Sequence, residues 1–400
     1  MKHTIKHLFI LAKTSCLAGV LSLCSSNLAL GAQSSAGSGE IAIYSQAAAG
    51  GSLTTADFVH DFDTVNREDT GSFSRTGTDV TLNRAGHYLA IYNSQFNNGF
   101  SPVGTEERVE VQSYLNLAGA PLPSGWSQGF IRRQQNQNET ITAGMAIFEA
   151  LSGDVLQLRS FRTDTTTVGT TSRAANATGL QIIKLDEVNM NYARLSLGAN
   201  QPGPTTATYV KVQYDTDDEL DSGFTHASSG DLTLVNGGKY LVVANTYVTG
   251  PNNRTGLVQR LTLDGTEVVG SKTTVYLRGS PQQNTQNGAA SIGMIIDATA
   301  GQVLNVEGSL DVNNSTTYNA DRCALTVIEL PSLAAGTAPA DPEYLSLVNT
   351  TDQNVNAATD TALTFGSQTQ IDSAFGHTIG TSAVTVNTDG DYLFLSSIYD

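Results

Sequence analysis

Two acidic stretches hold the side chains with the clearest potential for chemistry. DTVNRED recurs 152 residues later as DTDDELD, and both stretches begin and end with aspartate. The candidate ligands are Asp63, Asp69, Asp215, Asp217 and Asp221. Calcium takes six to eight oxygen ligands, which clustered loop carboxylates can supply. Neither stretch has EF-hand spacing, so a calcium loop and an acidic loop that only contacts solvent both remain open.

The other polar residues form no catalytic constellation. The sequence lacks H-E-x-x-H, G-x-S-x-G and Walker motifs, and it has no cysteine pair with zinc spacing. Four histidines follow the first 32 residues: His60, His87, His226 and His377. His226 and His377 are predicted to be solvated turn residues. We expect a protein that is not an enzyme, with no catalytic residues and no cofactor other than possible calcium.

Trp126, in PSGWSQGF, is the one residue that suggests ligand binding, because an aromatic ring can stack on a sugar. This residue makes an array of carbohydrate-binding, lectin-like modules the alternative function. The chain has a single tryptophan, so no other part of the sequence reproduces the feature. That absence counts against an array.

These side chains are carried on a sequence that repeats every 152 residues. HYLAIYN, KYLVVAN and DYLFLSS follow Gly86, Gly238 and Gly390, and DVTL, DLTL and AVTV precede these glycines at equal distance. Solenoid units are only about 20 to 50 residues long. Each copy is therefore predicted to be a separate domain.

Each copy reads as a series of short strands. The complete copies contain about eight apolar or alternating segments, and none has helical periodicity. The 38 glycines and the abundance of Thr, Asn and Ser favour strands joined by turns. The sequence therefore predicts an all-β protein of tandem β-sandwich or jelly-roll domains.

Domain boundaries follow from the repeat. We expect one jelly roll over residues 40–187, a second over 190–331, a linker over 332–343 and the first half of a third over 344–400. Half a sandwich cannot bury its own face. The incomplete third copy is therefore expected to be completed either by chain beyond residue 400 or by another chain.

The order of motifs resembles that of a known family. The first copy has DVTLNRAGHYLAIYN, then a strand–Gly–strand segment, then LSGDVLQL and a terminal apolar strand. This order resembles the tumour necrosis factor-like superfamily, which includes the complement globular-head domains. The second copy departs from the pattern at AGQVL, where Gln302 replaces Asp154. The resemblance implies a jelly-roll fold and association of neighbouring domains about a threefold axis.

The glycine strand is predicted to be covered on both faces. Tyr88 and Tyr92 alternate with Leu89 and Ile91, and neither set is polar. A two-layer sandwich covers only one side of each sheet, so the other side needs a partner. The resemblance implies a neighbouring jelly roll, with aromatic residues of this strand at the contact. The interface candidates are Tyr88, Tyr92, Tyr240 and Tyr392.

Alternatives for this contact stay open. A long loop could cover the second face in place of a domain. The partner domain could belong to the same chain, giving a cluster within one molecule, or to another chain, giving an intermolecular assembly.

The first 32 residues predict a secretory signal that is cleaved. Lys2 and Lys6 precede an apolar stretch, and ALGA supplies small residues for cleavage. Lys13 interrupts the apolar stretch, which argues against a permanent membrane span. LSLC, ending at Cys24, partly matches a lipoprotein box, but Leu23 is bulky where a small residue is expected. A lipid anchor at Cys24 is the weaker alternative.

Charge and cysteine content limit the possible partners. Cleavage of the signal removes three lysines and takes the formal net charge from −16 to −19. An acidic surface disfavours nucleic acid. Cys323 is then the sole cysteine, and its apolar strand context predicts a buried, inert thiol. We expect a secreted or cell-surface protein that acts in assembly or adhesion through other jelly rolls, a glycan or a surface protein.

Overall fold

The computed structural model places the described residues in two compact units, one within 40–330 and one within 345–387. The described residues are 40–99, 108–132, 139–163, 170–185, 190–227, 229–250, 254–277, 287–312, 314–330, 345–349 and 362–387. The predicted signal, Cys24, the linker and Tyr392 lie outside them. No helix within these residues is long and apolar enough to cross a membrane.

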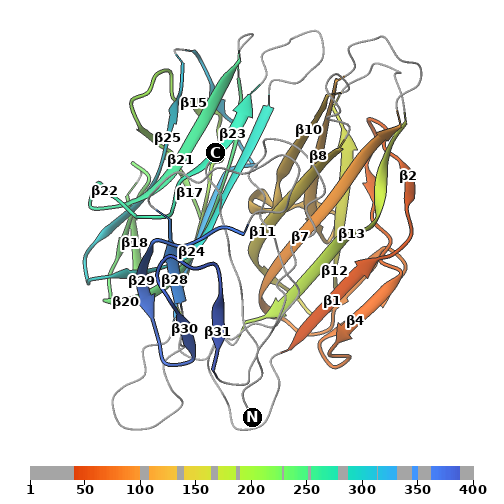
Figure 1. Cartoon of the computed structure of the whole chain (residues 1–400), viewed down its shortest axis with the longest axis horizontal. Coiled ribbons are helices and arrows are strands. Elements are labelled where there is room, and N and C mark those ends of the chain that lie inside the picture. The colour runs from red at the N-terminus through yellow and green to blue at the C-terminus, as the bar shows by residue number, and fades with distance from the viewer. Residues whose placement is uncertain are drawn as a thin grey trace. The chain divides into compact units, whose positions relative to one another are not determined.

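The first sandwich is built from two antiparallel sheets (Figure 1). One sheet has the order β11-β7-β13-β1-β4, with β2 paired to β13. Its strands are β1 (Ile41–Gln46), β2 (Gly50–Ser52), β4 (Thr64–Glu68), β7 (Gly86–Gly99), β11 (Glu139–Ala150) and β13 (Thr170–Lys184). The other has the order β10-β8-β12-β6-β5, with β3 beside β12 and β9 beside β8. Its strands are β3 (Phe58–Val59), β5 (Phe73–Thr76), β6 (Asp79–Leu82), β8 (Arg108–Leu117), β9 (Ala120–Pro121), β10 (Ser127–Arg132) and β12 (Asp154–Arg162); the 3-10 turn η1 (Pro123–Gly125) precedes β10.

The second sandwich follows directly in the sequence. Its first sheet has the order β15-β26-β20-β27-β14-β17, with β24 paired to β20. The strands are β14 (Tyr192–Ser196), β15 (Gln201–Pro202), β17 (Thr216–Leu220), β20 (Gly238–Thr249), β24 (Asn287–Ala298), β26 (Thr317–Tyr318) and β27 (Ala324–Glu329). The second sheet has the order β18-β19-β25-β21-β22, with β16 beside β25 and β23 beside β21. Its strands are β16 (Val210–Lys211), β18 (Phe224–Ala227), β19 (Asp231–Leu234), β21 (Thr255–Leu263), β22 (Thr266–Glu267), β23 (Thr273–Leu277) and β25 (Val303–Leu310).

The two sandwiches share one strand order. The path β11-β7-β13-β1-β4 of the first corresponds to β24-β20-β27-β14-β17 of the second, and β10-β8-β12-β6-β5 corresponds to β23-β21-β25-β19-β18. All these pairings are antiparallel, and the described residues contain no α-helix. The prediction of an all-β protein of jelly-roll sandwiches is confirmed.

The described part of the third copy consists of two short hairpin-like pairs. β28 (Leu345–Val348) pairs with β29 (Ser367–Ile371), and β30 (Phe375–His377) pairs with β31 (Val384–Val386). By position in the repeat they correspond to β1 with β4 and β5 with β6 of the first sandwich.

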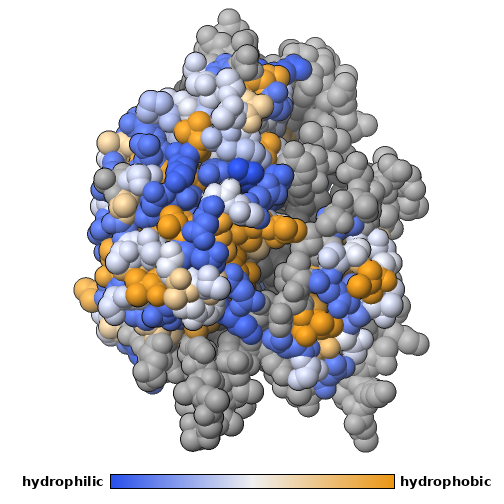
Figure 2. All heavy atoms as spheres, turned by 90° about the vertical axis from the view of Figure 1, so that its left-hand side faces the viewer, coloured by the Kyte–Doolittle hydropathy of each residue, from blue (hydrophilic) through white to orange (hydrophobic). Residues whose placement is uncertain are grey.

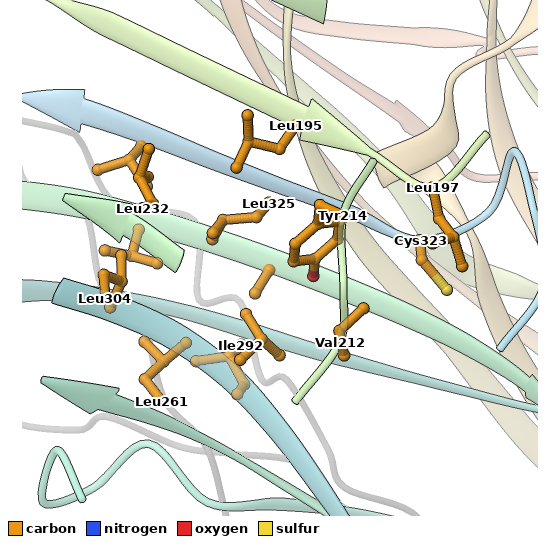
Figure 3. Packing of buried hydrophobic residues seen from close by; sticks show 14 of the residues in the cluster. Leu195, Leu197, Val212, Tyr214, Leu232, Leu261, Ile292, Leu304, Cys323 and Leu325 are labelled. Carbon is orange, nitrogen blue, oxygen red and sulfur yellow. The ribbon is translucent and has the colours of Figure 1, made fainter. Parts of the chain in front are cut away.

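Alternation along the glycine strand fills each interior. In β7, Tyr88, Ala90 and Tyr92 belong to the first core, and in β20, Tyr240 and Val242 belong to the second. Figure 3 shows leucines of several strands gathered around Tyr214 in the second core, with Cys323 at one end. The Cys323 thiol is fully buried, as predicted, and burial raises its pKa to about 12.

The repeated glycine has a conformational role in the first copy. Gly86 begins β7 with φ +136°, a value that residues with a side chain rarely adopt. The tyrosine two residues later can then turn back, and the Tyr88 hydroxyl donates to the Arg84 carbonyl at 2.6 Å. Tyr240 repeats this bond to the Asn236 carbonyl at 2.6 Å.

Candidate functional site at the junction of the two sandwiches

The tyrosines proposed for the interface lie inside their own sandwiches. The Tyr92 hydroxyl is 2.9 Å from the carbonyl oxygens of both Ser113 and Gly125. Tyr88 and Tyr240 are fully buried in the two separate cores. The assignment of Tyr88, Tyr92 and Tyr240 to a contact between domains is therefore wrong. A ring on the core-facing side of a strand cannot also reach a domain that covers the other side.

The opposite face of the same strands makes the contact. The residues on this outward face each expose at most 1% of their surface. They are Leu89, Ile91, Met145 and Ile147 in the first sandwich and Leu241 and Val243 in the second. β11 lies against β20 and β24, and β10 lies against β24. The Asn245 side-chain amide donates to the Met145 carbonyl at 3.1 Å. Both faces of these strands are therefore covered within this unit, and the outward faces of the two sandwiches cover each other.

His87 of the first sandwich contacts two residues of the second at one end of the contact. The His87 ring stacks on Tyr192 with centroids 3.8 Å apart and planes inclined by 9°. Its Nε2 lies 2.7 Å from Oε1 of Glu219. Burial opposes ionisation of Glu219, but the hydrogen bond and charge of His87 leave the pKa of this carboxyl below its usual value. His87 therefore links the two sandwiches.

Trp126 follows η1 and lies at the other end of the contact. Its ring stacks on Tyr114 at 4.5 Å, and the Arg322 guanidinium lies 4.1 Å from its centroid. Two groups this close cannot share one face of the ring, so both faces are covered. With only 6% of its surface exposed, Trp126 is not the open sugar-stacking platform that the sequence suggested. The Arg322 guanidinium also lies 4.7 Å from the Tyr247 ring, so it contacts aromatic rings of both sandwiches.

A buried carboxyl organises the polar groups beside these rings. Oε1 of Glu110 accepts from the side-chain amides of Gln112 at 2.6 Å and Asn287 at 3.2 Å. Gln112 also donates to the Tyr247 hydroxyl across the junction. Glu110 is fully buried, and this desolvation raises its pKa to about 7. Because both amides donate to Glu110, the orientation of each amide plane is determined.

Beside these groups, residues of both sandwiches line a solvent-open cavity of about 840 Å³. The first sandwich contributes Gln112, Pro121, Pro123, Trp126, Phe161 and Thr163, and the second contributes Asn200, Tyr247, Asn287, Asn319, Ala320, Asp321 and Arg322. The junction is the candidate functional site, because here apolar walls and converging polar groups lie together. Of these residues, only Trp126 was singled out from the sequence.

Four of the five predicted metal ligands accept hydrogen bonds from backbone amides. Asp63 accepts from the amides of Ala47 and Ala48 at 2.8 and 2.9 Å, and these bonds lower the pKa of its carboxyl. Asp69 accepts from the Gly71 amide. Among the residues that the structure describes, no three His, Cys, Asp or Glu side chains are grouped as a metal site.

The second acidic stretch repeats this arrangement. Asp215 accepts from the Gly198 amide at 2.6 Å and Asp221 from the Tyr192 amide at 2.8 Å. Asp217 bonds Nδ1 of His226, whose side chain is only 5% exposed. The expectation of a solvated His226 is therefore wrong, because this carboxylate holds the ring against the protein. His377 is likewise bonded, by Gln368 and the Thr381 carbonyl.

Chelation tests the calcium loop directly. Because backbone amides already bind the carboxylates of Asp63 and Asp215, we expect EDTA to change the melting temperature by less than about 1 °C. The measurement is differential scanning calorimetry of the full chain with EDTA or with calcium. A rise in melting temperature with calcium that disappears in Asp215→Asn would instead establish the calcium loop.

Comparisons with known proteins yield likeness of structure only. No protein-family model matches the chain, and no curated protein matches it. Murine APRIL at pH 5.0 is 10% identical over 37% of this chain and 100% of its own, with a TM-score of 0.26. Eiger TNF from S. frugiperda is 11% identical over 38% and 98%, with a TM-score of 0.24. The CBM22-1–CBM22-2 tandem domain of Paenibacillus barcinonensis Xyn10C is 12% identical over 75% and 100%, with a TM-score of 0.21.

Proposed function

We propose that this chain is a non-enzymatic interaction protein of the cell exterior, built from tandem tumour necrosis factor-like jelly rolls that act in assembly or adhesion. The observation that carries the proposal is the contact between the outward faces of β7 with β11 and β20 with β24. The chain uses one sheet face of a jelly roll to bind another.

The third copy repeats the residues of that face. In DYLFLSS, Leu393 and Leu395 occupy the repeat positions of Leu89 and Ile91. These leucines lie outside the described residues. From their place in the repeat we expect them to favour a further jelly roll as partner, since burial contributes about 25 cal/mol per Å² of apolar surface.

The surface character fits a protein that works outside the cell. Figure 2, which faces the second sandwich, shows hydrophilic residues over most of the coloured surface, with smaller orange groups between them. The formal net charge of −19 that remains after cleavage of residues 1–32 keeps such a surface soluble and disfavours nucleic acid. Residues 1–32 support export, which mass mapping of the N-terminus of extracellular protein tests.

Sedimentation velocity and electron microscopy of the exported protein test the assembly. We expect multimers for the wild type and a shift to monomer for Leu393→Asp with Leu395→Asp, because a buried unpaired charge opposes apolar contact. Ile379→Asp is the control for each single change, Leu393→Asp or Leu395→Asp: it places one aspartate in the same copy, at a side chain that is 60% exposed. A wild-type protein that remains monomeric at all concentrations contradicts the proposal.

A further inference from the structure

The junction cavity has walls of two kinds. Pro121, Pro123 and Phe161 of the first sandwich line it with apolar surface. Asn200, Asn319 and Asp321 of the second sandwich line it with amide and carboxylate groups, beside Arg322. Its volume of about 840 Å³ lies in the range of small-molecule sites, about 300 to 1,000 Å³.

The polar wall is held in position by backbone contacts. Asn200 Oδ1 accepts from the Ala320 amide at 2.7 Å, and the Asn319 amide donates to the Tyr247 carbonyl at 3.0 Å. The Asp321 amide donates to the Leu197 carbonyl at 2.8 Å. The segment from Asn319 to Arg322 is therefore tied to two different parts of the second sandwich.

Asp321 occupies a turn that aims its side chain away from the core. Its φ is +58°, in the left-handed region that aspartate and asparagine adopt more readily than other residues with side chains. The residue is exposed and lines the cavity.

Several polar groups of this wall have spare hydrogen-bonding capacity. Within the described residues, the Asp321 carboxylate makes no hydrogen bond or ion pair, and Asn200 uses only its amide oxygen. The Asn319 oxygen accepts from Thr249, which leaves its NH₂ group for another acceptor. Arg322 bonds Gln112 at 3.5 Å and the Tyr247 hydroxyl, and its guanidinium has no carboxylate partner in the described part of the chain.

The charges select the class of ligand. Arg322 and Asp321 carry opposite charges, so together they favour neither an anion nor a cation. The protein as a whole is strongly acidic, which further disfavours anions. Amides, one carboxylate and one guanidinium can all bond hydroxyl groups, since a hydroxyl both donates and accepts. The apolar wall suits the C–H face of a sugar ring.

We propose that the junction cavity binds a neutral saccharide of one or two units, with its hydroxyls on Asp321, Arg322 and the two asparagines and its apolar face toward Phe161. This inference rests on the proposed function, because a protein that acts outside cells meets glycans. The site is shared between the sandwiches, so one pair has one site. That sharing accounts for a tryptophan that no other copy reproduces.

The test is titration calorimetry of the full chain with glucose, galactose, mannose, N-acetylglucosamine and their β-1,4 disaccharides, with glucuronate as the acidic probe. We expect at least one neutral sugar to bind and glucuronate to bind at least tenfold more weakly. Asp321→Asn keeps a residue that tolerates positive φ but removes the charged acceptor, and we expect it to weaken binding at least tenfold.

Asp264→Asn is the matched control, because Asp264 is also an exposed aspartate at positive φ (+49°) and does not line the cavity. It should bind like wild type. The inference is overturned if no neutral sugar binds, if only glucuronate binds, or if Asp321→Asn binds normally. Multimers that form without sugar binding overturn this inference alone, whereas a sugar-binding monomer overturns only the proposed assembly.

Discussion

Acidification from pH 6.5 to pH 3 is expected to remove about 4 kcal/mol of stability from the unit within residues 40–330 through one buried residue, His60. His60 is fully buried, with Nε2 at 2.7 Å from Ser160 Oγ. Burial lowers its pKa from 6.5 to about 3, and the charge of Arg173 adds to the effect. The unfolded chain takes up a proton below pH 6.5 that the folded protein does not, so stability is lost as pH falls.

The surroundings of His60 explain why it stays neutral. Phe58 and Phe96 contact its ring edge-on at 5.3 and 6.1 Å, and Arg173 is 5% exposed. The Ser160 hydroxyl is in turn hydrogen-bonded to the Ser113 hydroxyl at 2.7 Å. A chain of buried hydroxyl groups therefore lies behind the His60 ring. An imidazolium at this position would have no carboxylate to pair with among the described groups that contact it.

Urea unfolding between pH 3 and pH 8 measures the effect, with fluorescence of the single tryptophan as the signal. His60→Gln is the informative variant, because glutamine can still bond Ser160 and does not titrate. The substitution can lower stability at every pH, so the informative quantity is the pH dependence. Between pH 4 and 6 the free energy of unfolding of the variant should lack the slope of about 1.4 kcal/mol per pH unit that His60 contributes in the wild type. His226→Gln, at a histidine bonded to an exposed carboxylate, is the control. An unchanged slope in His60→Gln contradicts the prediction.

Glu110 is expected to act in the opposite direction. Burial raises its pKa from 4.5 to about 7, despite hydrogen bonds from Gln112 and Asn287 that favour the carboxylate. The folded protein therefore holds a proton that the unfolded chain loses above pH 4.5. The stabilisation that this bound proton gives the folded protein is fully present below pH 4.5 and is lost as pH rises through about 7. The loss amounts to about 3 kcal/mol in the free energy of unfolding.

The Glu110→Gln variant isolates this contribution. Glutamine can mimic the protonated acid, so the variant should gain on wild type as pH rises from 4.5 to 8, by about 3 kcal/mol in total. The same urea titrations measure it. Glu139→Gln makes the same change at an exposed carboxyl on β11 that accepts a hydrogen bond from Gln95, and it is the control. A constant difference between Glu110→Gln and wild type across this range contradicts the prediction.

The two residues together predict an unusual wild-type profile. Between pH 4.5 and 6.5 their slopes have opposite signs and similar size, so the stability of the wild type changes little with pH there. In His60→Gln the free energy of unfolding should show the pH dependence due to Glu110, and in Glu110→Gln it should show the pH dependence due to His60. This cancellation distinguishes the pair of buried groups from a general acid sensitivity of a protein with 37 acidic residues.

Local sequence patterns were sufficient for the strands and for their repetition. Alternation in HYLAIYN and KYLVVAN implies two apolar faces without any knowledge of the fold, because side chains of a strand point to opposite sides. Burial of Leu89 and Ile91 on one side and of Tyr88 and Tyr92 on the other confirms this. The lone Cys323 in CALTVIEL was equally readable as a buried thiol.

Local sequence patterns do not predict which residues meet at the junction of the two sandwiches. Glu110 and Gln112 alternate with valines on β8 and look like the solvent face of a sandwich strand. They are buried because the second sandwich covers that face, which no local pattern reports. Arg322 and Asp321 belong to a turn some 200 residues away in the sequence, so nothing in the sequence links them to Trp126.

The amino-acid sequence by itself determined the all-β class, the 152-residue repeat and the need to cover a second apolar face, since these depend on residue type and short-range spacing. Only the tertiary structure decided which face meets the neighbouring jelly roll and which polar groups share the junction. Those outcomes depend on how two complete sandwiches dock. Docking brings together surfaces from distant parts of the chain, and the free energy of the contact belongs to the pair rather than to either segment alone.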